Sequence, residues 1–528
     1  MARGAVVDSA VSSVATPVSD GRRPAWPSTT VEQAVRRHAA ERPDEVAVVG
    51  TAATLTWAQL DAAADRAAAV IAATGGAGSR VAWLGQNDLG YVLALLGAWR
   101  QRSALVGLNW RLPDEALAAS CAEVRVTHVF TSEAFADRAR AAVGDGVHVE
   151  VVDQATAEPW PDRERVESLE PVATDLAMVF FTSGSTGVPK AVPLDRLAVE
   201  VGAATPVVHG FDPDSRLLIV PPVFHLAGAY WAQYGLLYGA RQIYVADPSP
   251  PGIVGAMADH GITHAVFVPT LIRALIDQLR ASPVSLPSFR HLAYGASPIT
   301  LPMLREAIDV FGCEMCQVLG MTEAGGVVTY LPPEDHRTDG SHAERLTSAG
   351  RCTTGVEVQV RDMVTGQPVP AGKSGELWFR TPFMAEGYLD RPEESAAVFV
   401  GGWLNTRDVG RLDQDGYVYV EGRSDDMIIT GGENVHPLEV ESVISELSDV
   451  AEVAVFGAPD DRWGRRVCAA VVRRSPALTE DVLVAHCRSR LAGYKVPRAI
   501  AFLDELPKTA TGKITRSGLT SIVPQQES

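Results

Sequence analysis

The chain has 528 residues, with 46 basic and 64 acidic side chains and a formal net charge of −18. A chain of this length exceeds the size at which one hydrophobic core stops growing, so two or more domains are expected. The acidic balance argues against a broad nucleic-acid-binding surface, and six cysteines in so long a chain exclude a disulfide framework.

The N-terminal segment shows no targeting signal. Asp8, Ser9, Ser12 and Ser13 interrupt its apolar residues, which argues against the apolar stretch of a signal peptide. No apolar run in the chain approaches the roughly 18 residues that a membrane span needs. We therefore expect residues 1–27 to be a flexible tail and the protein to be cytoplasmic, with no membrane span.

Strand and helix patterns then alternate to about residue 330, which predicts a layered α/β region. The first expected elements are a helix over Val31–Ala40 capped by Thr29 or Thr30, a strand over Val46–Gly50, a helix over Trp57–Ala73, a strand over Val81–Gly85 and a helix over Tyr91–Trp99.

The pattern changes at about residue 350. Short strands with turn signals between them are expected over Val356–Val360, Gly375–Arg380 and Tyr417–Glu421. After Gly422 a further small unit mixes helices and strands, over Leu438–Leu447, Val450–Gly457, Val467–Arg473 and Thr479–Leu491. The prediction is an α/β protein with a large N-terminal domain over 28–422, part of it β-rich, and a small C-terminal α+β domain over 423–528.

Cys313 and Cys316 form one CxxC pair without a second pair nearby. Because a structural zinc site needs four ligands, two packed thiols beside a strand are the better interpretation.

The segment most typical of a binding site is an apolar strand that runs into a loop of small residues and ends at a lysine. Its glycines let backbone N–H groups turn toward an anion, and its hydroxyls and lysine add donors and charge. The loop matches neither GxxxxGK[ST] nor GxGxxG, and the alternative is a flexible surface loop. The residues concerned are Thr182, Ser183, Gly184, Ser185, Thr186, Gly187 and Lys190.

This loop resembles the phosphate loop of the acyl-adenylate-forming superfamily, which includes acyl-CoA synthetases, adenylation domains of peptide synthetases, and luciferases. The likeness covers residues 29 to 516, and further segments follow in the order that the family has. These segments are Gln317–Glu323, Gly375–Leu377 with Gly387–Tyr388, Thr406–Asp408, Gly422–Asp426 and Pro507–Lys513.

The resemblance implies roles for the residues nearest the triphosphate. Glu323 corresponds to the magnesium ligand, which suits a hard cation that prefers oxygen. Thr322 corresponds to a donor to the α-phosphate, and Lys513 to the catalytic lysine between the carboxylate and the α-phosphate. Loss of such a preorganised cation is expected to lower the adenylation rate by a factor on the order of 10²–10³. A solvated loop lysine and a helix-capping carboxylate are the alternatives.

For the nucleoside, the resemblance places adenine against Gly295, Ala296 and Ser297, with Leu319 at the position of a stacking aromatic residue. Asp408 corresponds to the ribose-binding aspartate, whose two oxygens can accept both hydroxyls. Arg423 would contact the ribose, and Asp425 corresponds to the pivot of a mobile C-terminal domain. A plain surface turn is the alternative for Asp425.

The segment Pro222–Gly228 resembles the element that lines the acyl pocket of CoA ligases and contains His225. A buried core histidine is the alternative for His225. Nearby Ala227, Gly228, Gly325 and Gly326 are small, which favours a bulky, hydrophobic acid as the substrate.

The C-terminal domain supports coenzyme A as the acceptor. Gly431 and Gly432 resemble a glycine hairpin beside the pantetheine channel, where two glycines let a thiol-bearing arm pass close to the backbone. Trp463 lies among arginines and could stack on a nucleotide or pack in the core. From Arg462 to Arg516 there are 12 basic and 4 acidic residues, a cationic balance that fits either a polyanion or a solvated face.

Four positions depart from the family pattern. Leu319 loses roughly 1 kcal/mol of aromatic stacking on adenine. Arg407 replaces a glycine beside the ribose site and requires φ < 0 unless it is strained. Ala191 and Asp195 replace the usual glycine and histidine. These changes crowd the nucleotide site and leave Lys513 and Glu323 in place.

The predicted function is ATP-dependent, AMP-forming acyl-CoA ligation, with ATP, Mg²⁺ and coenzyme A as cofactors and a carboxylic acid as substrate. One alternative is transfer to coenzyme A of an acyl-adenylate that a partner enzyme makes. Others are loading of a carrier protein and non-catalytic binding of an acyl-adenylate. Dimers are common in the resembled family, so a homodimer is compatible with it.

Overall fold

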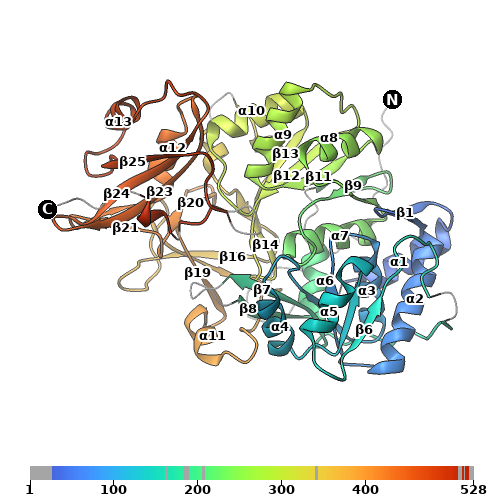
Figure 1. Ribbon diagram of the computed structural model, residues 1–528. Coiled ribbons are helices and arrows are strands. Elements are labelled where there is room, and N and C mark those ends of the chain that lie inside the picture. The colour runs from blue at the N-terminus through green and yellow to red at the C-terminus, as the bar shows by residue number, and fades with distance from the viewer. Residues whose placement is uncertain are drawn as a thin grey trace.

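The computed structural model describes residues 27–160, 163–183, 189–204, 209–338, 343–508, 514–516 and 518–522. Within these residues the strands form four sheets. Three sheets and their helices make up one large body, and the fourth sheet, with α12 and α13, lies to one side of it (Figure 1).

One sheet of the large body holds the strands that flank the predicted phosphate loop. Its inner strands are parallel, while β7 and β8 form an antiparallel hairpin at the edge. The order is β6 (His148–Val151), β5 (His128–Thr131), β3 (Arg80–Leu84), β4 (Ala104–Gly107), β7 (Leu176–Ser183) and β8 (Pro189–Asp195). Its helices are α2 (Trp57–Thr74), α3 (Leu89–Arg100), α4 (Asp114–Glu123) and α5 (Ala136–Ala142).

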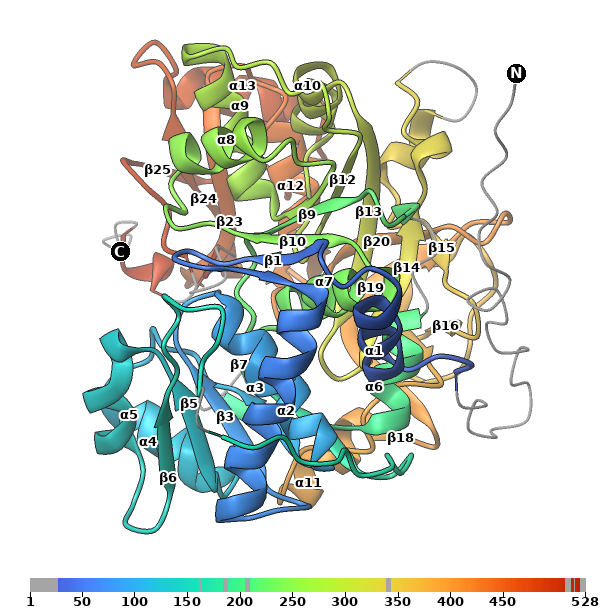
Figure 2. The ribbon, with the colours of Figure 1, turned by 90° about the vertical axis from the view of Figure 1, so that its right-hand side faces the viewer.

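A larger sheet lies beside the first, and Figure 2 shows the two sheets one above the other. The order is β15 (Arg351–Cys352), β14 (Gly326–Leu331), β13 (Glu314–Met321), β12 (His291–Gly295), β11 (His264–Phe267), β9 (Arg216–Ile219), β10 (Arg241–Tyr244), β1 (Val46–Val49) and β2 (Thr54–Thr56). The helices of this part are α1 (Val31–Glu41), α6 (Arg196–Ala204), α7 (Leu226–Tyr238), α8 (Pro250–Asp259), α9 (Pro269–Ala281) and α10 (Leu301–Phe311).

The third sheet is antiparallel and forms the β-rich part of the large body. It consists of β16 (Glu357–Arg361), β17 (Gly375–Arg380), β19 (Trp403–Leu412) and β18 (Phe399–Val400), with β20 (Val418–Arg423) paired to β19. Helix α11 (Pro392–Val398) precedes β18.

The fourth sheet forms the C-terminal unit. It consists of β22 (Glu433–Val435), β21 (Ile428–Thr430), β24 (Gly464–Arg473) and β23 (Val450–Asp460), with β25 (Ala499–Leu503) parallel to β24. Its helices are α12 (Pro437–Ile444) and α13 (Glu480–Arg488), and the short 3-10 helix η5 (Leu519–Ser521) lies against β23. The large body contains three further 3-10 helices among the described residues, η1 (Glu133–Phe135), η3 (Pro333–Asp335) and η4 (Ala343–Thr347). The chain passes from the third to the fourth sheet between Arg423 and Ile428, which is compatible with the expected boundary after residue 422.

Helix α3 shows how the sequence produces the central packing. All twelve of its residues are buried, and it is apolar on every side, which is typical of a helix enclosed by other elements. Asp88 caps its first turn by accepting a hydrogen bond from Leu89 N. At Gly97 an added Cβ would lie 2.7 Å from the Cβ of Ala67, so glycine permits the close approach of α3 to α2.

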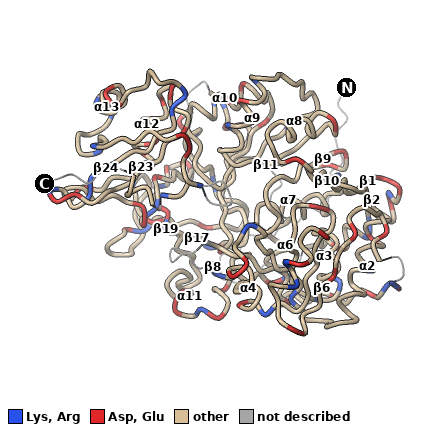
Figure 3. Tube along the Cα trace, viewed as in Figure 1, with Lys and Arg blue, Asp and Glu red and all other residues tan. Residues whose placement is uncertain are grey.

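The expected α/β class is confirmed, and the early elements begin and end within two residues of the predicted bounds. Thr30, one of the two expected caps, caps α1 in a reciprocal arrangement with Gln33. In the part of the chain that the structure describes, no helix is long and apolar enough to cross a membrane. Acidic and basic residues alternate over both units (Figure 3).

Candidate active site

The β7–β8 hairpin presents the predicted phosphate loop. Thr182 pairs with Lys190 and Ser183 with Pro189, so the two ends of the loop meet across the hairpin. The apolar residues before the loop hold β7 in the core, where Val179 and Phe180 are buried. Gly184, Ser185, Thr186 and Gly187 lie outside the described residues. The hairpin therefore places Lys190 opposite Thr182, at the start of the strand that follows the loop.

Lys190 is held by two side chains from the third sheet region. Its Nζ lies 2.5 Å from Glu394 Oε2 of α11 and 5.0 Å from the centre of the Tyr388 ring. The hydrogen bond from Lys190 lowers the pKa of Glu394, and a second bond from Arg391 adds to this effect. The ammonium has three donors, so two remain for another anion.

Glu323 follows β13 and faces the same tyrosine. Tyr388 donates its hydroxyl hydrogen to Glu323 Oε1 over 3.0 Å. Burial, followed by the charge of Glu323, raises the pKa of Tyr388, so the phenol stays protonated and remains a donor at neutral pH. Thr322 lies in the same turn, where its carbonyl accepts a hydrogen bond from Gly325 N.

The segment Ala385–Leu389, which we call the cross-tie, joins the loop after β13 to the β7–β8 hairpin. At one end Ala385 N donates to Glu323 O over 3.0 Å, and at the other Leu389 N donates to Ala191 O over 2.9 Å. Tyr388 therefore extends from a segment whose main chain is fixed at both ends.

The predicted adenine segment lies at the end of β12. Gly295 pairs with Val318 of β13, and Leu319 is the next residue along that strand. An added Cβ on Gly295 would lie 2.1 Å from Val318 O, which explains the need for glycine. Ala296 then adopts φ 66°, a left-handed conformation that turns the chain toward Ser297. Leu319 is half-buried and packs against the core of the third sheet.

Asp408 and Arg423 face one another on the paired strands β19 and β20, with Arg423 Nη1 3.2 Å from Asp408 Oδ1. The adjacent Arg407 has φ 58°, so it is strained as its substitution for glycine implied. Its guanidinium lies 3.4 Å from Asp425 Oδ2, and its carbonyl accepts hydrogen bonds from both Ser424 N and Ser424 Oγ.

In the C-terminal unit, Gly431 and Gly432 form the two-residue turn between β21 and β22. Both have positive φ, 58° and 87°, which is the backbone of a type I′ hairpin. The indole of Trp463 packs against this turn. Gly431 N donates a hydrogen bond to Trp463 O, and a Cβ added to Gly431 would lie 2.6 Å from Trp463 Cε3. The guanidiniums of Arg462 and Arg498 lie 4.9 and 4.7 Å from the ring of Trp463.

Two of the small residues near His225, Gly228 and Gly325, allow close packing of main chains. His225 occupies the N-cap position of α7 and lies 4.5 Å from Phe224, measured between ring centres. A Cβ on Gly228 would lie 2.3 Å from Pro221 O, and one on Gly325 would lie 1.8 Å from Phe383 O. These glycines let main chains approach each other, so they no longer support the inference of a bulky acid.

Lys513 lies outside the described residues, which stop at Lys508 and resume at Ile514. Those two flanking residues, Lys508 and Ile514, form an antiparallel bridge. Arg516 anchors the chain just beyond it through contacts to Asp426 at 3.1 Å and Glu441 at 2.6 Å.

Comparison with known proteins identifies the family of this chain. Residues 35–389 match the family model described as AMP-binding enzyme, and residues 439–513 match the model of the AMP-binding enzyme C-terminal domain. The chain belongs to the AMP-binding enzyme family. The expected acyl-adenylate-forming family and the expected class of enzyme, an acid–thiol ligase, are thereby confirmed.

Three proteins similar to this AMP-binding enzyme align over more than nine tenths of both chains. It is 35% identical to a feruloyl-CoA synthase of Amycolatopsis over 91% of this chain and 96% of that protein. It is 32% identical to a fatty acid–[acyl-carrier-protein] ligase of Streptomyces coeruleorubidus, over 93% and 96%. The o-succinylbenzoate CoA synthetase of Bacillus subtilis, solved with an acyl-adenylate intermediate, superposes with a TM-score of 0.80 at 29% identity, over 92% and 97%.

Two site residues of this AMP-binding enzyme were not assigned roles from the sequence. In the sequence, Tyr388 is only part of the Gly387–Tyr388 match, and Glu394 lies in no motif. Tyr388 could have been found from its place in that match. Glu394 carried no sequence signal, because its contact with Lys190 joins residues that lie far apart in the chain.

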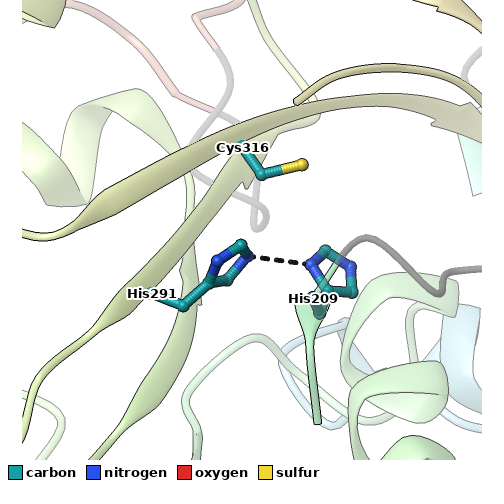
Figure 4. A group of neighbouring side chains, drawn as sticks. All are labelled: His209, His291 and Cys316. Carbon is teal, nitrogen blue, oxygen red and sulfur yellow. Dashed lines mark hydrogen bonds between the residues drawn. The ribbon is translucent and has the colours of Figure 1, made fainter. Parts of the chain in front are cut away.

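A separate buried cluster in the enzyme consists of His209, His291 and Cys316 (Figure 4). His209 Nδ1 lies 3.0 Å from His291 Nε2, a distance that a hydrogen bond between two neutral imidazoles explains without an ion. Burial lowers the pKa of His291 to about 3 and that of His209 well below its usual value. Cys316 is a buried free thiol and Cys313 a half-buried one, as expected for packed thiols.

Proposed function

We propose that this AMP-binding enzyme is an acyl-CoA ligase that works in two steps. In the first, a carboxylate oxygen attacks the α-phosphorus of ATP, the bond to the β-phosphate oxygen breaks, and pyrophosphate leaves. In the second, the thiolate of coenzyme A attacks the acyl carbon, the bond to the AMP oxygen breaks, and AMP leaves. The products are an acyl-CoA thioester, AMP and pyrophosphate.

The observation that carries this proposal is the pairing of Lys190 and Glu323 around Tyr388. The two residues come from different sheets, yet their charged groups contact the same side chain. Because the reaction brings two anions together, a fixed cation beside the triphosphate lowers the cost of their approach. Lys190 would hold phosphate oxygens, and Thr322 would donate to the α-phosphate.

Glu323 fits the binding of Mg²⁺. Its carboxylate accepts one hydrogen bond from Tyr388, which leaves further lone pairs for a hard cation. Bound there, Mg²⁺ would neutralise charge on the triphosphate. Asp408 and Arg423 lie close enough to each other to bind one ribose, with Asp408 accepting from its hydroxyls.

Transfer to coenzyme A is assigned to the C-terminal unit. The β21–β22 turn has no side chain at Gly431 or Gly432, so a thin pantetheine arm could pass it closely. Trp463 and its neighbouring arginines offer a face for a phosphorylated nucleotide. We propose that this unit turns about Asp425 between the two steps, which would bring first Lys513 and then the turn to the adenylate.

The test is a pyrophosphate-release assay with ATP, Mg²⁺ and a panel of acids, with and without coenzyme A. The names of relatives suggest ferulate, o-succinylbenzoate, indoleacetate and fatty acids for this panel. We expect pyrophosphate from at least one acid, a thioester when coenzyme A is added, and loss of both products in Glu323→Gln. Release of pyrophosphate that the E323Q variant leaves unchanged would contradict the role of Glu323.

A carrier protein is the competing acceptor, because one relative is named for an acyl-carrier-protein product. The same reaction is therefore run with a phosphopantetheinylated carrier protein in place of coenzyme A. Thioester on the carrier but not on coenzyme A would replace the proposal with the carrier-loading function. If supplied acyl-adenylate yields thioester while no acid releases pyrophosphate, the enzyme performs only the second step.

A further inference from the structure

Tyr388 contacts both Glu323, to which we assign Mg²⁺ binding, and Lys190, to which we assign the phosphate oxygens. Its hydroxyl donates to Glu323 Oε1 at 3.0 Å, and its ring centre lies 5.0 Å from Lys190 Nζ. The first contact uses the phenolic oxygen and the second uses the π face, so one side chain serves two charged groups of opposite sign.

Hydrogen bonds fix the backbone around Tyr388, so its side chain can set the distance between Glu323 and Lys190. The cross-tie binds Glu323 O at one end and Ala191 O at the other, and Tyr388 N donates to Ser395 Oγ of α11 over 2.8 Å. The ring also packs edge-on against Phe399 at 5.7 Å between centres. The tyrosine is therefore held by its main chain and by its ring, independently of the two charged contacts.

Lys190 is held against this ring from another direction. Glu394 Oε2 lies 2.5 Å from its Nζ, and Arg391 Nη1 lies 3.2 Å from Glu394 Oε1. The ammonium has three N–H donors and Glu394 takes one, so donor capacity is left for phosphate oxygens.

We propose that Tyr388 is a positioning residue that sets the spacing between Glu323 and Lys190 and thereby couples Mg²⁺ binding to triphosphate binding. This inference rests on the proposed function. The hydroxyl orients the carboxylate toward the cation, and outer partners of this kind typically change metal affinity about 10–100-fold when removed. The ring orients the ammonium toward the phosphates. Because the two contacts use different atoms, substitution separates them.

The experiment measures the affinity of the full-length enzyme for α,β-methylene-ATP by calorimetry, once with Mg²⁺ and once with EDTA. Tyr388→Phe keeps the ring and removes the hydroxyl, so affinity with Mg²⁺ should fall roughly tenfold while affinity with EDTA stays unchanged. Tyr388→Leu also removes the π face, so affinity should fall in EDTA as well, by about threefold.

A double variant tests the coupling directly. Tyr388→Phe combined with Glu323→Gln should bind no more weakly than Glu323→Gln alone, because the hydroxyl acts only through the carboxylate. Tyr417→Phe is the matched control, since Tyr417 donates to Asp335 Oδ2 at 2.6 Å away from this site. The control should bind the analogue as the unmodified enzyme does.

Two outcomes would overturn the inference. One is wild-type affinity of Y388F with Mg²⁺, and the other is additive losses from Y388F and E323Q. If E323Q and Lys190→Ala still weaken binding of the ATP analogue when either outcome is seen, only the role of Tyr388 is rejected and the proposed function stands. If neither of them weakens binding, the proposed function itself fails. Should Y388L not fold, Y388F and the double variant decide the question, because they keep the ring.

Discussion

Arg407 combines a left-handed backbone with contacts to the segment between the third and fourth sheets. Its φ is 58°, which costs a residue with a Cβ about 1–2 kcal/mol. Its contact with Asp425 is half-exposed, so this ion pair offsets little of that cost. The strain therefore persists because Ser424 binds the Arg407 carbonyl twice.

Replacing Arg407 with glycine should raise the free energy of unfolding by about 1 kcal/mol, because glycine adopts this conformation without strain. Chemical denaturation measures the change. Arg411→Gly is the control, since Arg411 lies in the same strand without a positive φ and its replacement should destabilise the enzyme. Destabilisation by both substitutions would show that Arg407 is not strained in solution.

The role proposed for Lys513 differs between the two steps. Lys513→Ala should lower pyrophosphate release by a factor on the order of 10²–10³ and should leave transfer from a supplied acyl-adenylate close to the unmodified rate. Parallel assays of the two half-reactions measure this ratio. An equal loss in both would contradict the assignment of Lys513 to adenylation.

The sequence indicates roles for some residues of the candidate site and gives no signal for others, and the reason is physical. Roles could be predicted for Lys190, Glu323, Asp408 and Arg423 because each lies in a short motif whose spacing is local. The bond between Lys190 and Glu394 and the one between Tyr388 and Glu323 join residues brought together only by the fold. For Gly228 and Gly325 near His225 the structure shows close main-chain packing, which the sequence could not reveal, because glycine in a sequence looks the same whether it borders a cavity or a neighbouring main chain.

At the scale of elements, the β21–β22 turn depends on two glycines for different reasons. Both have positive φ, but only Gly431 lies against Trp463. Gly432→Ala should therefore cost about 1 kcal/mol from backbone strain alone. Gly431→Ala should cost more, because its Cβ would also displace the indole. Thermal unfolding of both variants compares them, and equal losses would mean that Trp463 moves freely.

Helix and strand positions were predictable where the apolar period is strong, as in the α1 helix and the β17 strand. Which strands pair with one another in the sheets was not predictable. The neighbours of β9, for example, are β10 and β11, while β1 joins the far side of β10 although it lies nearly two hundred residues earlier in the chain. Such pairing depends on contacts of long sequence separation, which periodicity does not encode.

At the scale of the whole molecule, buried neutral histidines should make stability depend on pH. Burial lowers the pKa of His264 and His336 to about 4 and that of His291 to about 3. In the unfolded chain these groups titrate near 6.5. The unfolded state therefore binds more protons below pH 6.5, and the free energy of unfolding should fall as the pH drops from about 6.5 to about 4.

Denaturation midpoints between pH 8 and pH 4 measure this dependence. His291→Gln removes one titrating group and should flatten the curve below pH 6.5. His260 is exposed, so His260→Gln should leave the slope unchanged. A curve for H291Q that is as steep as that of the unmodified enzyme would contradict the assignment.

All six cysteines are free, four of them buried and two half-buried, and burial raises the pKa of each thiol. Thiols of this kind react slowly with maleimides, because the thiolate is the reactive form. A cysteine engineered on the surface of each unit could then carry a fluorophore with little background labelling. Energy transfer between the two dyes would report the distance between the labelled sites on the two units in real time, during turnover and without a crystal.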